Sequence, residues 1–240
     1  PNNGNTDEAN YYLGESYTML NNPERALGYY GKVISNGESS FTTKASYRAA
    51  GIYMQQKSYK QAVDLYKRVI ESSSEKRQII LSQLEMMVAY YELGDYSSVK
   101  SLSNKIILEG NEVVANASNR AILYKLKTFV KEGNKQQAEK TWVELQEAGK
   151  DIFAAEGLYN LAFLLFQNKK YEESNELIDK YRGDYYAYSD WFDMYNLLIA
   201  DNYLGDGDSL NAREVLNAII ENSKNEAMRT AAKEKLATIR

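Results

Sequence analysis

The sequence predicts an all-α fold, an array of antiparallel helix pairs that follow one another along the chain. The 240 residues include only two prolines, where an average composition near 5% would give about twelve. Proline breaks helix interiors, so its scarcity favours helix almost throughout. Apolar residues also recur at helical spacing, as in Ala62, Leu65, Tyr66 and Val69, and strand-like alternation is not sustained anywhere.

One residue pattern occurs six times. It consists of a tyrosine, replaced by phenylalanine in the fourth set and leucine in the fifth, then a small residue nine positions later and an apolar residue seven positions after that. The small residues are spaced by 36, 37, 39, 36 and 38 positions. Such near-constant spacing predicts six structural repeats. The six sets are Tyr17, Ala26 and Val33; Tyr53, Ala62 and Val69; Tyr90, Val99 and Ile106; Phe129, Ala138 and Leu145; Leu165, Ser174 and Tyr181; and Tyr203, Ala212 and Ile219.

Each repeat divides into two helices joined by a short polar turn. Gly94, Gly133 and Gly205 are expected to end first helices in the left-handed conformation. Asn22 before Pro23 reads as an N-cap followed by proline at the first helical position. We expect close helix–helix contacts at Ala26, Ala62, Ala138 and Ala212, where a larger side chain would overpack the crossing. The repeats are placed at 7–40, 43–76, 80–112, 119–150, 155–187 and 193–224, within one domain spanning 1–240.

The last stretch, 225–240, forms no pair. Met228, Ala231, Ala232, Leu236 and Ile239 lie at helical spacing with lysines between them. A single amphipathic helix over the last apolar face is the capping device that repeat arrays need.

The pattern resembles the tetratricopeptide repeat, over roughly residues 7–224. Leu13, Gly14, Tyr17, Ala26 and Tyr30 carry the resemblance best. It implies a right-handed superhelical solenoid whose first helices line a concave groove. The chain departs from the family in its longer repeats and in lacking the closing proline. Those closing places hold Glu38, Ser74, Asn111, Lys150, Tyr186 and Lys224.

Composition excludes several kinds of chemistry. The chain has no histidine and no cysteine, which removes imidazole bases, thiol nucleophiles, disulfides and the usual zinc sites. A net charge of −4 argues against nucleic-acid binding. The longest apolar runs are six residues, too short to span a membrane. The first residue is Pro1 rather than methionine, so we expect a processed chain or a fragment of a longer protein.

Three pairs of acids are close enough in sequence to be candidate catalytic groups: Asp7 with Glu8, Glu172 with Glu173, and Asp206 with Asp208. Two carboxylates act as general acid and base only when burial separates their pKa values. All three pairs lie at helix starts or turns, where the helix dipole favours an acid. We therefore expect no enzyme, no cofactor and no metal site.

The resemblance implies a protein or peptide partner in the groove. The family's groove-facing places combine an apolar, aromatic strip with a basic stripe of Arg120, Lys127 and Lys131, whose charges are expected to be solvated. The groove residues predicted to form one continuous concave face are Leu84, Val88, Tyr91, Leu123, Lys127, Lys131, Tyr159, Phe163 and Phe166.

Two alternatives stay open at this point. The same apolar residues could be buried between helices or covered by self-association, which would make the chain a spacer or dimerisation arm of a longer protein. The aromatic segment 181–195 is expected to pack against neighbouring helices, with a glycan platform or a protein contact as the other interpretations. Resemblance to envelope lipoproteins of this repeat family favours a periplasmic or outer-membrane location over a cytoplasmic one.

Overall fold

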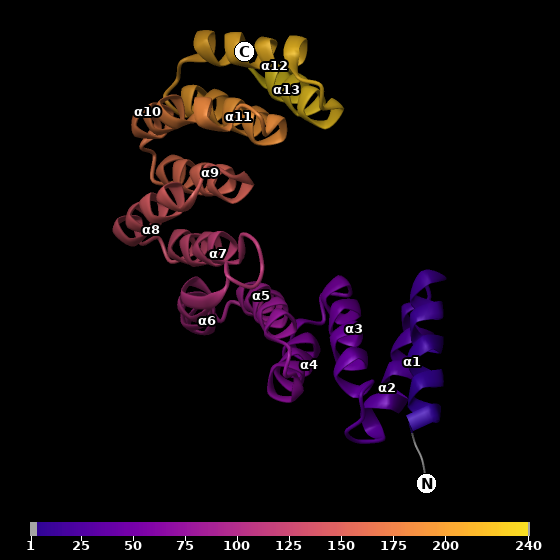
Figure 1. The fold of residues 1–240 in the computed structure, drawn as a ribbon. Helices are drawn as coiled ribbons and strands as arrows, with labels where there is room; N and C mark the ends of the chain where they lie inside the picture. The colour runs from indigo at the N-terminus through magenta and orange to yellow at the C-terminus, as the bar shows by residue number, and fades with distance from the viewer. Residues whose placement is uncertain (1–3, 240) are drawn as a thin grey trace. The chain divides into compact units, whose positions relative to one another are not determined.

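The computed structural model describes residues 4–239, and these residues fold into helices without any strand (Figure 1). The thirteen α-helices predicted from the sequence are all present in this stretch, and one short 3-10 helix is added. The helices are α1 (Gly4–Met19), α2 (Pro23–Ser35), α3 (Thr42–Gln55), α4 (Tyr59–Ser72), α5 (Lys76–Glu92), α6 (Tyr96–Glu109), α7 (Ala117–Lys131), α8 (Lys135–Ala148), α9 (Ile152–Gln167), α10 (Tyr171–Tyr181), η1 (Arg182–Tyr185), α11 (Ser189–Gly205), α12 (Ser209–Asn222) and α13 (Glu226–Thr238).

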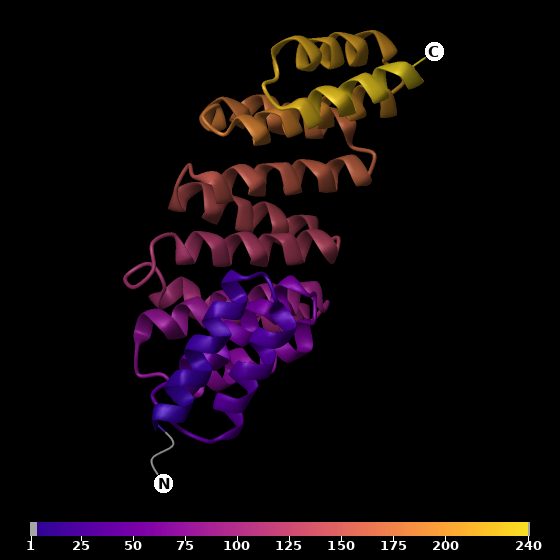
Figure 2. The same ribbon diagram turned by 90° about the vertical axis from the view of Figure 1, so that its right-hand side faces the viewer.

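The chain divides into two compact units, Pro1–Tyr124 and Lys125–Arg240, and the division falls within α7. In the first unit α1 to α6 pack in chain order, each helix against the next. In the second unit α8 to α13 do the same, and Figure 2 shows this succession from a second direction. Antiparallel helix pairs are thus the building block of both units, as the repeat pattern predicts.

The first helix of every pair ends in the same kind of turn. One residue of the turn has a positive φ, and the next amide donates to the carbonyl of the residue at the tyrosine position of the pattern, as from Ser58 N to Tyr53 O at 2.8 Å. This is the Schellman arrangement, which satisfies carbonyls at a helix end. The positive-φ residues of the six turns are Asn21, Lys57, Gly94, Gly133, Lys169 and Gly207.

The turn confirms Gly94 and Gly133 as left-handed residues, whereas the same prediction for Gly205 is wrong. Gly207 takes the left-handed conformation instead, at φ 85°. Gly205 is the last residue of α11, and a Cβ added there would lie 2.5 Å from the Tyr171 ring. Close approach of two helices, not backbone conformation, therefore requires the glycine at 205.

The second helices begin at side-chain caps. Asn22, Asp95, Asn134 and Asp208 each accept a hydrogen bond from the amide three residues later, at 3.1–3.2 Å. These bonds satisfy amide donors that the first turn of a helix leaves unpaired. The polar residues between the two arms of each repeat thus end one helix and start the next.

The predicted small-residue positions lie at the helix crossings. Ala26, Ala62, Ala138 and Ala212 are each 0% exposed, which confirms this part of the repeat alignment. In the first two repeats the tyrosine one turn later packs in the same cluster: Tyr30 with Ala26, and Tyr66 with Ala62. The repeat pattern in the sequence is therefore the pattern of the core.

Candidate protein-interaction surface

The nine residues predicted for the groove fall in both units. Leu84, Val88, Tyr91 and Leu123 belong to the first, and the other five to the second. Leu84 and Leu123 are only 2% and 1% exposed, because they lie in the helix packing. They are therefore core residues rather than parts of a surface, and the continuity of one face across the other seven residues stays a prediction.

The second unit carries a row of five aromatic rings, here called the aromatic strip. It consists of Tyr159, Phe163 and Phe166 of α9, Trp191 of α11 and Tyr171 of α10. Successive ring centroids, from Trp191 through Tyr159, Phe163 and Phe166 to Tyr171, are 5.9, 6.0, 5.8 and 5.7 Å apart. All five side chains are partly exposed. The strip is thus a continuous aromatic surface that the described residues leave partly open.

The sequence of α9 explains why these rings reach the surface. Residues 159, 163 and 166 recur at i, i+4 and i+7, so they share one face of the helix. The opposite side is buried through Leu158, Leu161 and Leu165. The helix is thus apolar on two faces, one buried against its neighbours and one forming the strip.

A close helix contact fixes the position of α9. A Cβ added at Gly157 would lie 2.7 Å from Leu145 Cδ2 and 3.3 Å from the Trp142 ring of α8. Asp151 caps the start of α9 by accepting hydrogen bonds from the amides of Phe153 and Ala154, both at 3.0 Å. The strip therefore stands on a helix held at its start and against its neighbour, which limits the entropy lost when a partner binds.

Two ion pairs lie near the strip, with their acids on α9 and α11. Lys127 Nζ lies 2.8 Å from Glu156 Oε1, and Lys235 Nζ lies 2.6 Å from Asp201 Oδ1. Burial raises the pKa of the Tyr159 hydroxyl, and the negative charge of Asp201 raises it further. The carboxylate of Asp201 is therefore close enough to the strip to act on one of its rings.

The predicted basic stripe is only partly a free positive surface. Arg120 Nη1 lies 2.8 Å from Glu85 Oε1 in the first unit, and Lys127 is paired with Glu156 in the second. The expectation that these two charges are solvated is wrong, because each is neutralised by an acid 35 or 29 residues away in the chain. Lys131 is exposed, as predicted.

In the first unit only two of the four predicted groove residues reach the surface. Val88 and Tyr91 of α5 are partly exposed. The ring of Tyr91 contacts those of Tyr124 and Tyr96, with centroids 5.4 and 5.9 Å apart. This is a smaller aromatic group than the strip of the second unit.

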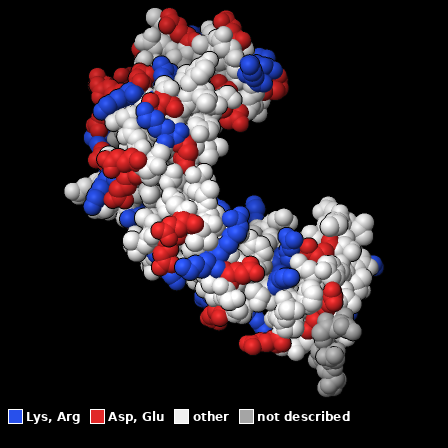
Figure 3. Space-filling view, in the orientation of Figure 1, with Lys and Arg blue, Asp and Glu red and all other residues white. Residues whose placement is uncertain are grey.

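Charges of both signs are interspersed over the face drawn in Figure 3. Electrostatic steering of a strongly charged partner needs a surface of one sign. Apolar contact at the strip therefore offers more binding energy than charge.

One acid of each candidate catalytic pair has a structural partner. Asp7 is buried and accepts a hydrogen bond from Asn36 Nδ2 at 2.7 Å. Bonds from the backbone and side chain of Asn211 hold the pKa of Asp208 below its usual range. Bonds from Lys135 and Lys170 do the same for Glu173. Each of these acids is used to hold helices or turns.

Over residues 4–239, no group of three or more acids, histidines or cysteines is placed to hold a metal ion. Within the same part of the chain, no helix is both long and apolar enough to cross a membrane.

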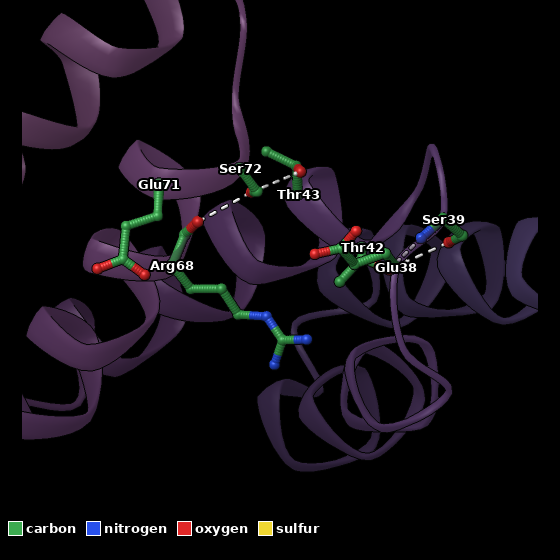
Figure 4. Close-up of a pocket in the computed structure, with 7 residues that line it drawn as sticks. All are labelled: Glu38, Ser39, Thr42, Thr43, Arg68, Glu71 and Ser72. Atoms are coloured by element: carbon green, nitrogen blue, oxygen red, sulfur yellow. Dashed lines mark hydrogen bonds between the residues drawn. The ribbon is translucent and has the colours of Figure 1, made fainter.

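A polar pocket of about 730 Å³ lies in the first unit, where the turn before α3 meets the end of α4 (Figure 4). Its hydroxyls bond largely within the protein: Thr43 and Ser72 point toward one another at 2.9 Å, and Ser72 donates to Arg68 O at 2.8 Å. Arg68 donates to Ile34 O at 3.3 Å. The pocket has no aromatic or apolar wall, so the strip is the better candidate for a partner.

The aromatic segment 181–195 mostly packs inside the second unit. Tyr185 and Tyr195 are both buried, and Tyr195 donates to Ala155 O at 2.7 Å. Tyr186 is exposed at the edge of an open cleft of about 1150 Å³ beside Phe192. Packing, the preferred interpretation of this segment, therefore accounts for its buried members.

Sequence reasoning missed two members of the strip. Trp191 stands in the aromatic segment, and Tyr171 is the first residue of α10, so neither occupies a groove-facing place of the repeat pattern. Helix packing brings both rings beside those of α9. The available signal was their aromatic character, which the repeat register alone did not connect to α9.

The fold and the strip together define a helical-repeat protein with an exposed aromatic surface. Residues 13–76 match the family model described as tetratricopeptide repeat. The match covers the first two helix pairs in part, and antiparallel helix pairs of the same kind continue along the described residues beyond it. No curated protein matches the sequence closely enough to count as a relative.

Solved structures extend the fold over nearly the whole chain. A tetratricopeptide repeat protein from Parabacteroides merdae is similar with a TM-score of 0.71 at 14% identity, covering 97% of this chain and 86% of that chain. The apo form of the quorum sensor NprR from B. thuringiensis has a TM-score of 0.61 at 20% identity, covering 96% and 67%. At these identities the likeness is one of fold.

Proposed function

We propose that the chain is a non-enzymatic scaffold that binds an extended or helical segment of a partner protein, with the aromatic strip of α9 as its main contact. The observation that carries this proposal is the unbroken row of five partly exposed rings. Aromatic side chains supply much of the binding energy of protein interfaces. Exposed apolar surface of this kind otherwise costs solubility.

The resemblance to the tetratricopeptide family supports the same class of partner. Helix grooves bind amphipathic helices through apolar anchors at i, i+3, i+4 and i+7, and aromatic grooves also bind extended segments. The ion pairs of Glu156 and Asp201 near the strip would form part of a polar rim, which sets orientation more than affinity. The partner segment is therefore expected to be apolar or aromatic at its centre.

Selection of displayed random peptides on the purified chain tests the proposal. Selected peptides should bind Phe163→Ala at least about tenfold more weakly, a loss of more than 1 kcal/mol at a central aromatic anchor. Val143→Ala is the matched control, because Val143 is an exposed apolar residue on α8 outside the strip. Equal loss in both variants, or unchanged binding to Phe163→Ala, would contradict the assignment of the strip.

A spacer or arm within a longer protein is the alternative function. It predicts that no peptide is enriched and that Phe163→Ala changes only stability. A role in the cell envelope remains a prediction from resemblance, and fractionation of cells that express the complete gene product tests it.

A further inference from the structure

One turn of the first unit carries two residues that can react with each other. Asn36 closes the end of α2, and Gly37 follows it at φ 99°. In an Asn–Gly pair no Cβ shields the backbone nitrogen that follows the asparagine, so this nitrogen can reach the side-chain amide carbon. The other such pair of the sequence is Asn3 with Gly4, and Asn3 lies outside the described residues.

The reaction of such a pair is deamidation. The Gly37 nitrogen loses its proton to solvent base and bonds to the side-chain carbonyl carbon of Asn36. The bond from that carbon to the side-chain nitrogen breaks, and the nitrogen leaves as ammonia. Water then opens the five-membered succinimide at one of its two carbonyls, which gives aspartate or isoaspartate. Water is the only co-reactant, and nothing is oxidised or reduced.

The structure leaves the reacting groups accessible. Asn36 is exposed and Gly37 is partly exposed. The bond from Asn36 N to Lys32 O is the last backbone bond of α2, and among the described residues nothing accepts a hydrogen bond from the Gly37 amide. Asn36 has ψ −5°, so ring closure requires rotation about its Cα–C bond. No bond of the attacking nitrogen opposes that rotation.

The side-chain amide of Asn36 has a structural role. Its Nδ2 donates to Asp7 Oδ1 at 2.7 Å, and Asp7 is only 1% exposed. The bond joins the start of α1 to the end of α2, and these helices pack as the first pair. Deamidation replaces the donor by a carboxylate oxygen. Two negative charges would then face each other where Asp7 is shielded from water.

We propose that Asn36 is a site of spontaneous deamidation, and that its conversion loosens the α1–α2 pair. The product has no hydrogen to donate to Asp7, and its charge repels that of Asp7. An acid at position 36 also lies at the C-terminal end of α2, where the helix dipole disfavours negative charge. The pair should therefore open locally more often, while distant repeats keep their packing.

Peptide mapping by tandem mass spectrometry tests the site. Trypsin cleavage after Lys32 and Lys44 releases a peptide in which Asn36 is the only asparagine. In mildly alkaline buffer Asn36 should gain one mass unit at least about tenfold faster than Asn168. Asn168 is the internal control, because it also closes a helix, at φ −87° and ψ 11°, and is followed by Lys169 at φ 58°. Equal rates at the two sites would overturn the assignment of Asn36.

Hydrogen exchange tests the consequence. Asn36→Asp carries the aspartate product, and its α1 and α2 amides should exchange at least about tenfold faster than those of the unmodified chain, with α12 unchanged. In the Asp7→Asn background the same substitution should accelerate exchange much less, because the amide at 7 can donate to the carboxylate at 36. The helix dipole acts equally in both backgrounds, so the comparison isolates the contact between the two side chains. Equal acceleration in both backgrounds, or none in either, would overturn the coupling to Asp7.

Discussion

Lys127 and Lys131 lie one helical turn apart on α7 but in different surroundings. The ammonium group of Lys127 is partly buried against Glu156, whereas Lys131 is exposed. Solvated charges contribute little to folding, and a paired charge contributes more as its burial increases. The two residues therefore form a natural matched pair.

Reversing the charge at Lys127 should destabilise the protein. Lys127→Glu places a second carboxylate beside Glu156, and we expect a loss of about 1 kcal/mol in the free energy of unfolding, measured in urea. Lys131→Glu should change it by less than about 0.5 kcal/mol. The double variant Lys127→Glu with Glu156→Lys should recover most of the loss, and failure to do so would show that the two charges are not coupled.

Buried tyrosines predict instability in alkali. Burial is the main cause that raises the pKa of the Tyr30, Tyr66, Tyr185 and Tyr195 hydroxyls above their ordinary value near 10. In the unfolded chain these groups lose their protons first, so their contribution is full below pH 10 and is lost as the pH rises above it. Above pH 10, each of these tyrosines lowers the free energy of unfolding by up to about 1.4 kcal/mol per pH unit.

Urea unfolding at pH 8, 9, 10 and 11 measures this effect. Stability should be level between pH 8 and 9 as far as tyrosine is concerned, and should fall steeply from pH 10 to 11. Tyr66→Phe should make the fall of the free energy of unfolding with pH less steep, by the amount that one titrating group contributes. A slope unchanged in that variant would show that Tyr66 titrates as an exposed residue does.

At the scale of the helix, two glycines of the first pair have opposite roles. A Cβ at Gly14 would lie 2.5 Å from the Tyr30 ring, while one at Gly28 would meet nothing within 4 Å. Gly14 lies within α1 and Gly28 within α2, both in helical conformation. The first glycine permits close packing, and the second only weakens its helix.

Alanine at each position should therefore shift stability in opposite directions. Gly14→Ala should cost about 1–3 kcal/mol by overpacking the crossing. Gly28→Ala should stabilise by about 0.5–1 kcal/mol through helix propensity. The midpoints of urea unfolding report both, and destabilisation by Gly28→Ala would mean that its face is covered.

The repeat register was predictable because close helix crossings admit only small side chains, and Ala26 and Ala62 mark them at regular spacing. Leu84 of α5 and Leu123 of α7 were not placed correctly, since each stands among further apolar residues of its helix and the sequence does not say which side a neighbour covers. The pairing of Lys127 with Glu156 was equally hidden. It joins residues of successive repeats, whose distance depends on how the helices stack.

At the scale of the whole molecule, repeat arrays derive their stability from neighbouring repeats. The cap α13 should therefore protect the end of the second unit more than any distant part. Ala232, fully buried in the last apolar cluster, is the residue through which this can be tested.

Ala232→Asp buries a carboxylate and should cost about 2–4 kcal/mol locally. Hydrogen exchange of α12 and α13 amides should accelerate, while amides of α3 keep their protection. Ala227→Asp, at an exposed position in the first turn of the same helix, should have no such effect because the helix dipole favours an acid there. Equal acceleration throughout the chain would show that the array unfolds as one cooperative block.

The packing described above joins helices that are one or two apart in chain order. Under tension applied at the two ends, the helix contacts given for the described residues would not require distant repeats to separate before neighbouring ones. Force would peel one helix pair at a time, and each step would release the 36–39 residues of a repeat, about 130 Å of extended chain. Sequential packing thus predicts that the protein lengthens under load in steps of one repeat and refolds repeat by repeat when the load is removed, as single-molecule stretching would measure.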